Sequence, residues 1–148
     1  MFSNATSFNQ DIGRWNVSSV INMGSMFYNA ASFDQDIGGW DVSNVTNMYG
    51  LFRNAAVFNQ DIRDWDVSNV TDMTYMFNRA SSFNQDIGGW NVSKVADMYG
   101  MFYFASSFNQ DLSGWCVGLI PEKPGAFDTG ATSWTLPDSR PVWGTCPS

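Results

Sequence analysis

The hydrophobic residues of this chain repeat with a period of 25 positions. The segment Phe-Asn-Gln-Asp-Ile at residues 8–12 returns at residues 33–37, 58–62, 83–87 and 108–112, with at most one substitution in each copy. Between the copies, the same hydrophobic positions recur without a gap. A fixed period of this length is typical of a solenoid, in which each coil packs only on its neighbours. We therefore expect stacked coils whose aromatic residues and methionines form continuous buried columns.

Two spacings within each coil predict two secondary-structure elements. Residues Trp40–Val45 alternate in polarity at first and are rich in residues that favour strands. From Met48 to Ala55 the hydrophobic positions follow the i, i+3, i+4, i+7 spacing of a helix, and Asn47 before them is a favoured helix N-cap. The predicted fold class is therefore α/β, with one short parallel strand and one short helix in each 25-residue coil.

The repeat ends before the chain does. Residues 1–117 form the predicted solenoid of about five coils, the first of them incomplete because Met1 aligns with Met26 inside the repeat. All five prolines lie after Val117, and proline blocks the addition of further strands. We expect residues 118–148 to form an irregular C-terminal capping segment, and we expect the first coil to be uncapped.

The repeat unit also resembles a known family. Its pattern Phe-Asn-Gln-Asp-Ile-x-x-Trp-Asn/Asp-Val-Ser-x-Val-x-x-Met-x-x-Met-Phe-x-x-Ala, over residues 1 to about 117, is similar to that of the BspA-type leucine-rich-repeat surface proteins. The resemblance implies a right-handed leucine-rich-repeat solenoid. It also implies a secreted or cell-surface protein, because many members are surface-exposed and several are associated with adhesion or host binding.

Composition and charge narrow the function classes. The net charge is −7, which disfavours nucleic-acid binding and electrostatic docking on an anionic membrane. No run of hydrophobic residues is long enough for a membrane helix, and the N-terminus does not read as a signal peptide. There is no histidine, so a Ser-His-Asp or Cys-His catalytic arrangement cannot form. We expect no enzymatic activity and no cofactor.

Cys116 and Cys146 are the only cysteines, and both lie at or beyond the end of the repeat. In a secreted protein they would most simply form one disulfide, which would close a loop of about 30 residues. The alternative is a pair of free buried thiols in a cytosolic protein. A zinc site is not expected, because no histidine or second cysteine pair is present.

The outward positions of the predicted strand form the candidate ligand face. This face is small, polar and acidic, so it could engage a protein or a glycan, or hold a weakly bound Ca²⁺ ion. The alternative is a solvated face whose side chains satisfy local backbone groups. A neighbouring column of aspartates, one per coil from Asp11 to Asp111, is expected to cap turns, with calcium bridging as its alternative. The candidate face residues are Arg14, Asn16, Asp41, Ser43, Asp64, Asp66, Ser68 and Asn91.

Two hypotheses for function follow from this pattern. The first is an extracellular interaction module that binds a protein or glycan through the acidic face. The second is a structural spacer or self-stacking repeat protein without a ligand of its own, which would associate with copies of itself through the uncapped N-terminal coil.

Overall fold

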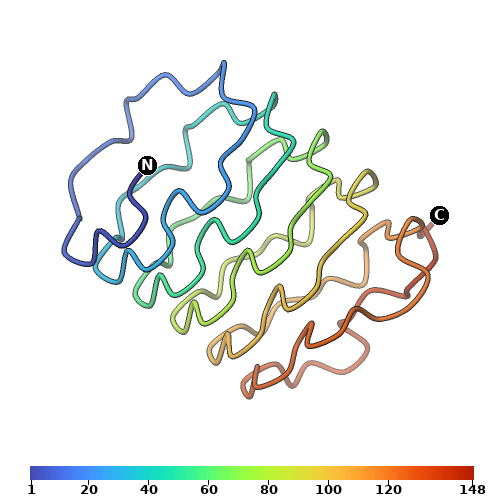
Figure 1. The fold of residues 1–148 in the computed structure, drawn as a ribbon. Helices are drawn as coiled ribbons and strands as arrows, with labels where there is room; N and C mark the ends of the chain where they lie inside the picture. Colours follow the sequence, from blue (N-terminus) through green and yellow to red (C-terminus); the bar gives the residue numbers. More distant parts are fainter.

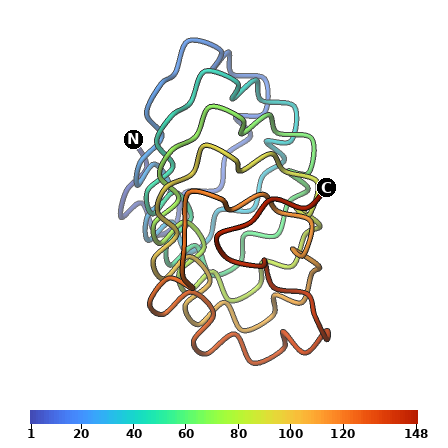
Figure 2. The same cartoon turned by 90° about the vertical axis from the view of Figure 1, so that its right-hand side faces the viewer.

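The computed structural model describes all 148 residues and shows a stack of coils that runs from the N-terminus to the C-terminus (Figures 1 and 2). Each coil is bonded to the next through the backbone. The amide of Phe27 donates to the carbonyl of Leu51 at 3.0 Å, and the equivalent bond from Phe52 reaches Met76 at 2.9 Å. The stacking predicted from the 25-residue period is therefore confirmed.

The predicted strand and helix in each coil are wrong. The structure contains no helix, and its only β-pairing consists of isolated parallel bridges from Asn22 to Asn47, Asn47 to Asp72 and Asp72 to Asp97. The remaining backbone forms turns and irregular segments. The molecule is thus not an α/β leucine-rich-repeat solenoid. It also contains no helix with the length and hydrophobicity needed to span a membrane.

Left-handed residues explain why the helical spacing did not produce a helix. In the segment from Met48 to Ala55, Gly50 and Asn54 have φ angles of 56° and 59°, which a right-handed helix cannot contain. Every second amide in this segment donates to the next coil. Between them, the amides of Leu51, Arg53 and Ala55 each donate to the carbonyl three residues earlier and close four-residue turns. The same pair of left-handed positions recurs along the stack, at Ser25 and Asn29, Tyr75 and Arg79, and Gly100 and Phe104.

The predicted strand is also replaced by turns. Within Trp40–Val45, the amide of Val45 donates back to the carbonyl of Val42 at 2.9 Å. The parallel bridges lie instead at Asn47 and its equivalents, the position at which a helix N-cap was expected. Backbone pairing between coils therefore occurs where the sequence predicted the start of a helix, and a turn replaces the predicted strand.

The aromatic columns form the core, as predicted. Phe27, Phe52 and Phe77 stack with ring centroids 5.7 Å apart at each step, and all three are fully buried. The indole of Trp65 donates to the carbonyl of Ile37 at 3.0 Å, which lies 28 residues earlier on the preceding coil. The same bond is made by Trp40, Trp90 and Trp115. Each of these four tryptophans therefore satisfies a buried carbonyl of its neighbour as well as filling space. Trp15 on the first coil, which was expected in the same buried column, is 43% exposed and donates no such bond.

Polar side chains connect neighbouring coils outside the core. The Oδ1 atom of Asn59 accepts hydrogen bonds from the amide of Asn84 at 2.9 Å and from Nε2 of Gln85 at 3.0 Å. Asn9, Asp34 and Asn84 make the same pair of bonds to the coil that follows. Asn and Asp are interchangeable here because both offer the acceptor oxygen that the contact needs.

The C-terminal segment continues the stack beyond the sequence repeat. The amides of Phe102 and Phe104 donate to the carbonyls of Phe127 and Thr129, both at 2.8 Å, in the pattern that joins the earlier coils. Two left-handed residues four positions apart, Ala126 and Gly130, also recur here. The irregular cap expected for residues 118–148 therefore begins as a further turn of the stack. Its far end is joined back by the Cys116–Cys146 disulfide, so the cysteines are paired rather than free.

Candidate functional site

Side-chain turns build the candidate ligand face. The Oδ1 atom of Asp41 accepts hydrogen bonds from the amide of Ser43 at 3.1 Å and from its hydroxyl at 2.6 Å. Aspartate and asparagine favour this arrangement because their short side chains reach the backbone amide two residues further on. The equivalent amide bond is made from Ser18 to Asn16, Ser68 to Asp66 and Ser93 to Asn91.

The second column of aspartates forms the same kind of turn. The carboxylates of Asp11, Asp36, Asp61, Asp86 and Asp111 each accept a hydrogen bond from the amide two residues later, at 2.9 to 3.0 Å. The turn-capping role predicted for this column is confirmed. Only Asp61 also forms an ion pair, with Nε of Arg63 at 2.9 Å.

These turns favour the charged form of the carboxylates. The hydroxyl of Ser43, followed by its amide, lowers the pKa of Asp41, and Ser68 lowers the pKa of Asp66 in the same way. The charge of Asp41 opposes part of that effect at Asp66, so the two carboxylates sense one another. Hydrogen bonding to the ionised form is the cause in both cases.

The structure brings part of the predicted set together. We call five aspartates the acidic edge: Asp41, Asp64 and Asp66 of the predicted face, together with Asp61 and Asp86 of the neighbouring turn-capping column. All five are exposed, and their positions lie on three adjacent coils. Asp64 forms no hydrogen bond or ion pair, and Asp41 and Asp66 bond only within their own turns. Arg14 and Asn16 are exposed on the first coil and Asn91 on a later one, while Ser43 and Ser68 are half-buried turn donors. No group of three or more acidic or cysteine side chains is arranged to hold a metal ion.

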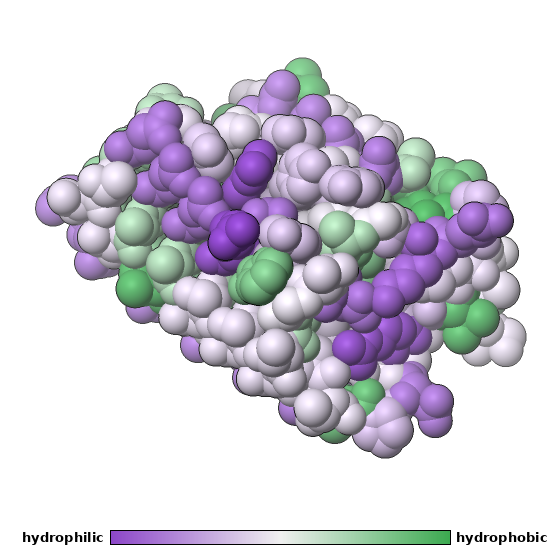
Figure 3. Space-filling view, turned by 60° about the horizontal axis from the view of Figure 1, so that its bottom comes forward, coloured by the Kyte–Doolittle hydropathy of each residue, from purple (hydrophilic) through white to green (hydrophobic).

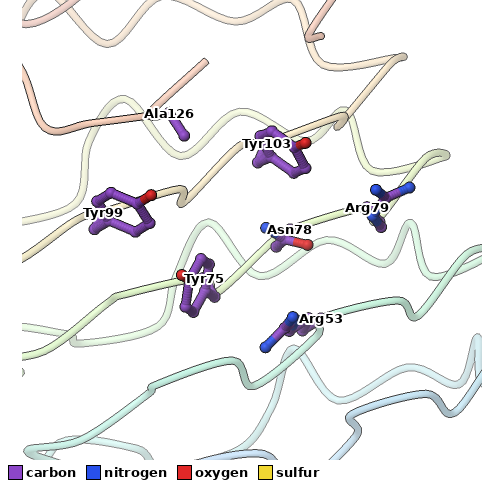
Figure 4. Close-up of a pocket in the computed structure, with 7 residues that line it drawn as sticks. All are labelled: Arg53, Tyr75, Asn78, Arg79, Tyr99, Tyr103 and Ala126. Carbon is purple, nitrogen blue, oxygen red and sulfur yellow. The ribbon is translucent and has the colours of Figure 1, made fainter. Parts of the chain in front are cut away.

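A separate hollow was not foreseen from the sequence. It has a volume of about 260 Å³ and is lined by Arg53, Tyr75, Asn78, Arg79, Tyr99, Tyr103 and Ala126, which come from successive coils (Figure 4). We call it the Arg–Tyr pocket. No carboxylate lines it. Within one coil the pocket is lined by residues of the segment 75–79, whereas the acidic edge lies on the segment 61–66.

Variation between coils was the signal that could have found this pocket. The core columns hold nearly the same residue in every coil, whereas the column that contains Asn78 reads Tyr28, Arg53, Asn78 and Tyr103. Asn78 is the smallest of the four, so the stack is locally hollow above it. The sequence shows the variation, but only the coil geometry shows that these positions share a surface.

One face of the molecular surface is mixed in polarity. The face drawn in Figure 3 carries hydrophilic residues gathered in rows, with separate hydrophobic residues between them. No extended hydrophobic area covers that face. Recognition there would therefore depend on polar and aromatic side chains rather than on a large apolar patch.

The comparisons with known proteins place the chain in a family but not in a function class. Comparison with curated proteins and with solved structures finds no match. A family described as "Mycoplasma protein of unknown function, DUF285" matches residues 1–52 and 32–133. The second match extends past Val117 into the C-terminal turn of the stack. Because the matches together span residues 1–133 of 148, the chain belongs to the family described as Mycoplasma protein of unknown function, DUF285.

Proposed function

We propose that this chain is an extracellular interaction module that binds a protein or glycan through the acidic edge. The observation that carries this proposal is the set of exposed carboxylates at Asp41, Asp64 and Asp66, none of which forms an ion pair with a basic side chain. Arg63 lies near Asp64 and Lys94 near Asp66, but neither forms an ion pair with its neighbour. The three carboxylates therefore remain open to a partner.

The acidic edge is held in place before any partner arrives. The turn bonds to Ser43 and Ser68 fix the carboxylates of Asp41 and Asp66, so little side-chain freedom is lost on binding. Both groups are ionised at neutral pH, as aspartates are even without the lowering of their pKa by these hydrogen bonds. Charge complementarity favours a partner with basic groups, such as a lysine- or arginine-rich segment, over a neutral glycan.

An extracellular location is supported by two observations. The Cys116–Cys146 disulfide is typical of proteins in oxidising compartments. The repeat unit also resembles that of the BspA-type surface proteins, which supports a location at the cell surface. Protease treatment of intact cells tests this location: we expect the chain to be degraded, and a chain that stays protected until the cells are lysed would contradict it.

Charge-neutral variants test the acidic edge. In the triple variant Asp41→Asn, Asp64→Asn and Asp66→Asn, the turns are kept because Asn16 and Asn91 already serve at the equivalent positions. We expect this variant to lose at least tenfold in signal on arrays of basic peptides and of glycans, relative to the unchanged protein.

A matched control has the same change in net charge elsewhere. In the triple variant Asp34→Asn, Asp72→Asn and Asp97→Asn, each position has a natural asparagine in another coil. We expect binding by this control to be unchanged. Equal binding by both triple variants would reject the acidic edge as the contact surface, and loss of signal on glycans alone would identify the partner as a glycan.

A second candidate function, self-assembly, is favoured by the surface of the first coil. Met1, Trp15 and Ile21 are 85%, 43% and 61% exposed, and a hollow of about 240 Å³ lies beside Met1, Val20, Met23 and Met26. In later coils the equivalent side chains are covered by the preceding coil; Met26 and Trp40, for example, are 9% and 4% exposed. A second copy of the chain could cover Met1 and Trp15 on the first coil in the same way. Sedimentation velocity over a wide concentration range tests this, and a strict monomer at high concentration would reject it.

A further inference from the structure

The Arg–Tyr pocket is a positively charged site on an acidic molecule. The chain has 7 basic and 14 acidic residues, and the ion pairs of the structure use Arg63, Lys123 and Arg140. Arg53 and Arg79 line the same pocket and make no ion pair and no side-chain hydrogen bond. The two arginines line one pocket that no carboxylate lines, so an anion bound there would be attracted by both positive charges.

Aromatic rings hold both guanidinium groups in place. The Cζ atom of Arg53 lies 5.5 Å from the ring centroid of Tyr28 and 4.8 Å from that of Tyr75. Arg79 lies against Tyr103 and Phe104, at 5.5 and 5.1 Å. Cation–π contacts leave the N–H groups of an arginine free to donate at its edge. The donors are therefore fixed in position but unused.

Two buried polar groups also lack full partners. Nε of Arg53 is buried and has no hydrogen-bond partner. Asn78, only 4% exposed, forms the floor of the hollow, and its Nδ2 reaches the carbonyl of Gly100 only at 3.5 Å. Unsatisfied buried donors cost free energy, so native proteins seldom keep them without a partner or a functional reason. Figure 4 shows Asn78 between the tyrosine pair Tyr75 and Tyr99 and the two arginines.

We propose that the Arg–Tyr pocket binds a single sugar ring that carries an oxyanion, either a carboxylate or a sulfate. The guanidinium groups of Arg53 and Arg79 would donate to the oxyanion, since arginine matches the geometry of such groups. The ring of Tyr99, which is 44% exposed, would pack on the sugar ring, and the amide of Asn78 would bond a hydroxyl. The volume of about 260 Å³ is below the usual range for drug-sized ligands, so it suits one ring and not a longer segment.

The backbone around the pocket disfavours a peptide as the ligand. The amides of Tyr75, Arg79 and Gly100 already donate to the next coil, at 2.9, 2.7 and 3.0 Å. No free strand edge is left for an extended peptide to pair with, so recognition depends on side chains alone. The inference extends the proposed interaction role to a second surface and does not depend on the acidic edge.

Titration with small sugars tests the proposal. The probes are methyl β-glucuronide, N-acetylglucosamine 6-sulfate, neutral methyl β-glucoside, and free acetate and sulfate, each followed by NMR shifts of the tyrosine rings. We expect one or both acidic sugars to bind with a dissociation constant in the millimolar range, and the neutral sugar and free anions to bind at least tenfold more weakly. The two acidic arms distinguish a carboxylate from a sulfate.

Paired arginine variants locate the site. Arg79→Gln should weaken binding of the acidic sugar at least fivefold, because Arg79 is exposed and its change leaves the core intact. Arg14→Gln removes the same charge from another exposed arginine and should leave binding unchanged. Arg53→Lys keeps the charge at this half-buried position but removes the planar donor group, and should also weaken binding.

The outcomes separate this proposal from the acidic edge. The proposal would be overturned if neither acidic sugar bound at concentrations tenfold above the expected millimolar dissociation constant. It would also be overturned if acetate bound as tightly as the acidic sugars, or if Arg79→Gln bound them as tightly as the unchanged protein. The acidic-edge triple variant should bind the sugars as the unchanged protein does. Loss of sugar binding in that variant alone would place the sugar on the acidic edge and would also overturn the Arg–Tyr site.

Discussion

At the scale of single residues, the fold requires an acceptor oxygen at the turn positions but not a charge. Asn16, Asp41, Asp66 and Asn91 occupy equivalent places and accept the same hydrogen bond from the amide two residues later. The turn at these positions can therefore form without the negative charge of Asp41 or Asp66. This separation of roles is what makes the acidic edge a candidate for binding and makes asparagine the suitable test substitution.

The same carboxylates predict a pH dependence of stability. The pKa values of Asp41, Asp61, Asp66 and Asp111 are lowered by hydrogen bonds that favour the ionised form. Their contribution is therefore present above the unfolded-state pKa of about 3.9 and is lost as the pH falls through the lower folded-state pKa. We expect the urea midpoint to fall between pH 5 and pH 2, and to fall less in a variant with Asp41→Asn and Asp66→Asn. An identical decrease in both proteins would contradict this assignment.

The buried tryptophans give a second residue-scale prediction. In Trp65→Phe the carbonyl of Ile37 loses its indole donor while remaining inside the core. An unsatisfied buried acceptor costs about 1–3 kcal/mol, so we expect a decrease of that size in the free energy of unfolding measured with urea. Trp15→Phe is the control, because Trp15 is 43% exposed and donates no such bond. A similar cost at both positions would show that ring size, and not the hydrogen bond, is responsible.

At the scale of the coil, the sequence predicted the repeat and the buried columns but not the backbone path. Met48, Leu51, Phe52 and Ala55 point into the core whether the segment is a helix or a series of turns that bond to the next coil, so hydrophobic spacing cannot distinguish the two. The left-handed residues decide it. Gly50 and Asn54 are residue types that adopt this conformation readily, so they indicate it in one coil. The same two positions are occupied in other coils by Tyr75, Arg79 and Phe104, whose residue types do not predict a left-handed conformation.

The tyrosine that lies over a glycine provides the test at this scale. Gly100 has φ of 58°, and a Cβ atom there would come within 2.7 Å of the ring of Tyr75. We expect Gly100→Ala to lower the free energy of unfolding by about 1–3 kcal/mol, because left-handed strain and overpacking act together. Gly89→Ala is the matched control, since nothing lies within 4 Å of its Cβ position and its φ is ordinary. Equal effects of the two changes would rule out the close contact as the cause.

At the scale of the whole molecule, the two candidate sites differ in how far the sequence could reveal them. Asp41, Asp64 and Asp66 of the acidic edge lie at defined positions of the repeat, so the sequence alone could name them as face candidates, whereas Asp61 and Asp86 were expected only to cap turns. The Arg–Tyr pocket needs four coils at once and depends on one small residue, Asn78, between larger neighbours in its column. A single repeat unit carries no trace of it, because the hollow exists only when unequal coils are stacked.

The disulfide joins the last turn of the stack to the coil before it. Cys116 and Cys146 are 30 residues apart, and beside them the amide of Val117 donates to Thr145 at 2.8 Å. In the chain-entropy model, a loop of that length contributes about 3–4 kcal/mol. We expect a variant with Cys116→Ser and Cys146→Ser to lose about that much unfolding free energy, with hydrogen exchange fastest after residue 118. The unchanged protein treated with reductant should match it; a reduced protein as stable as the oxidised one would contradict the prediction.

Nearest-neighbour stacking predicts that position along the stack sets the cost of a core substitution. Phe77 is fully buried and packs on Phe52, Phe83 and Phe102, with ring centroids 5.7, 4.0 and 5.6 Å away, so it is covered from both sides. Phe77→Ala should therefore cost about 3–5 kcal/mol of unfolding free energy. It should also speed hydrogen exchange in the coils on both sides, because each coil is stabilised by the two it touches.

Phe2 occupies the equivalent column on the first coil, where it is only half-buried. Phe2→Ala should cost less than half as much as Phe77→Ala and should speed exchange only near the first coil. Equal costs, or loss of protection along the entire stack in both variants, would mean that the molecule unfolds as one cooperative block, and the additive view of coil stability would then be wrong.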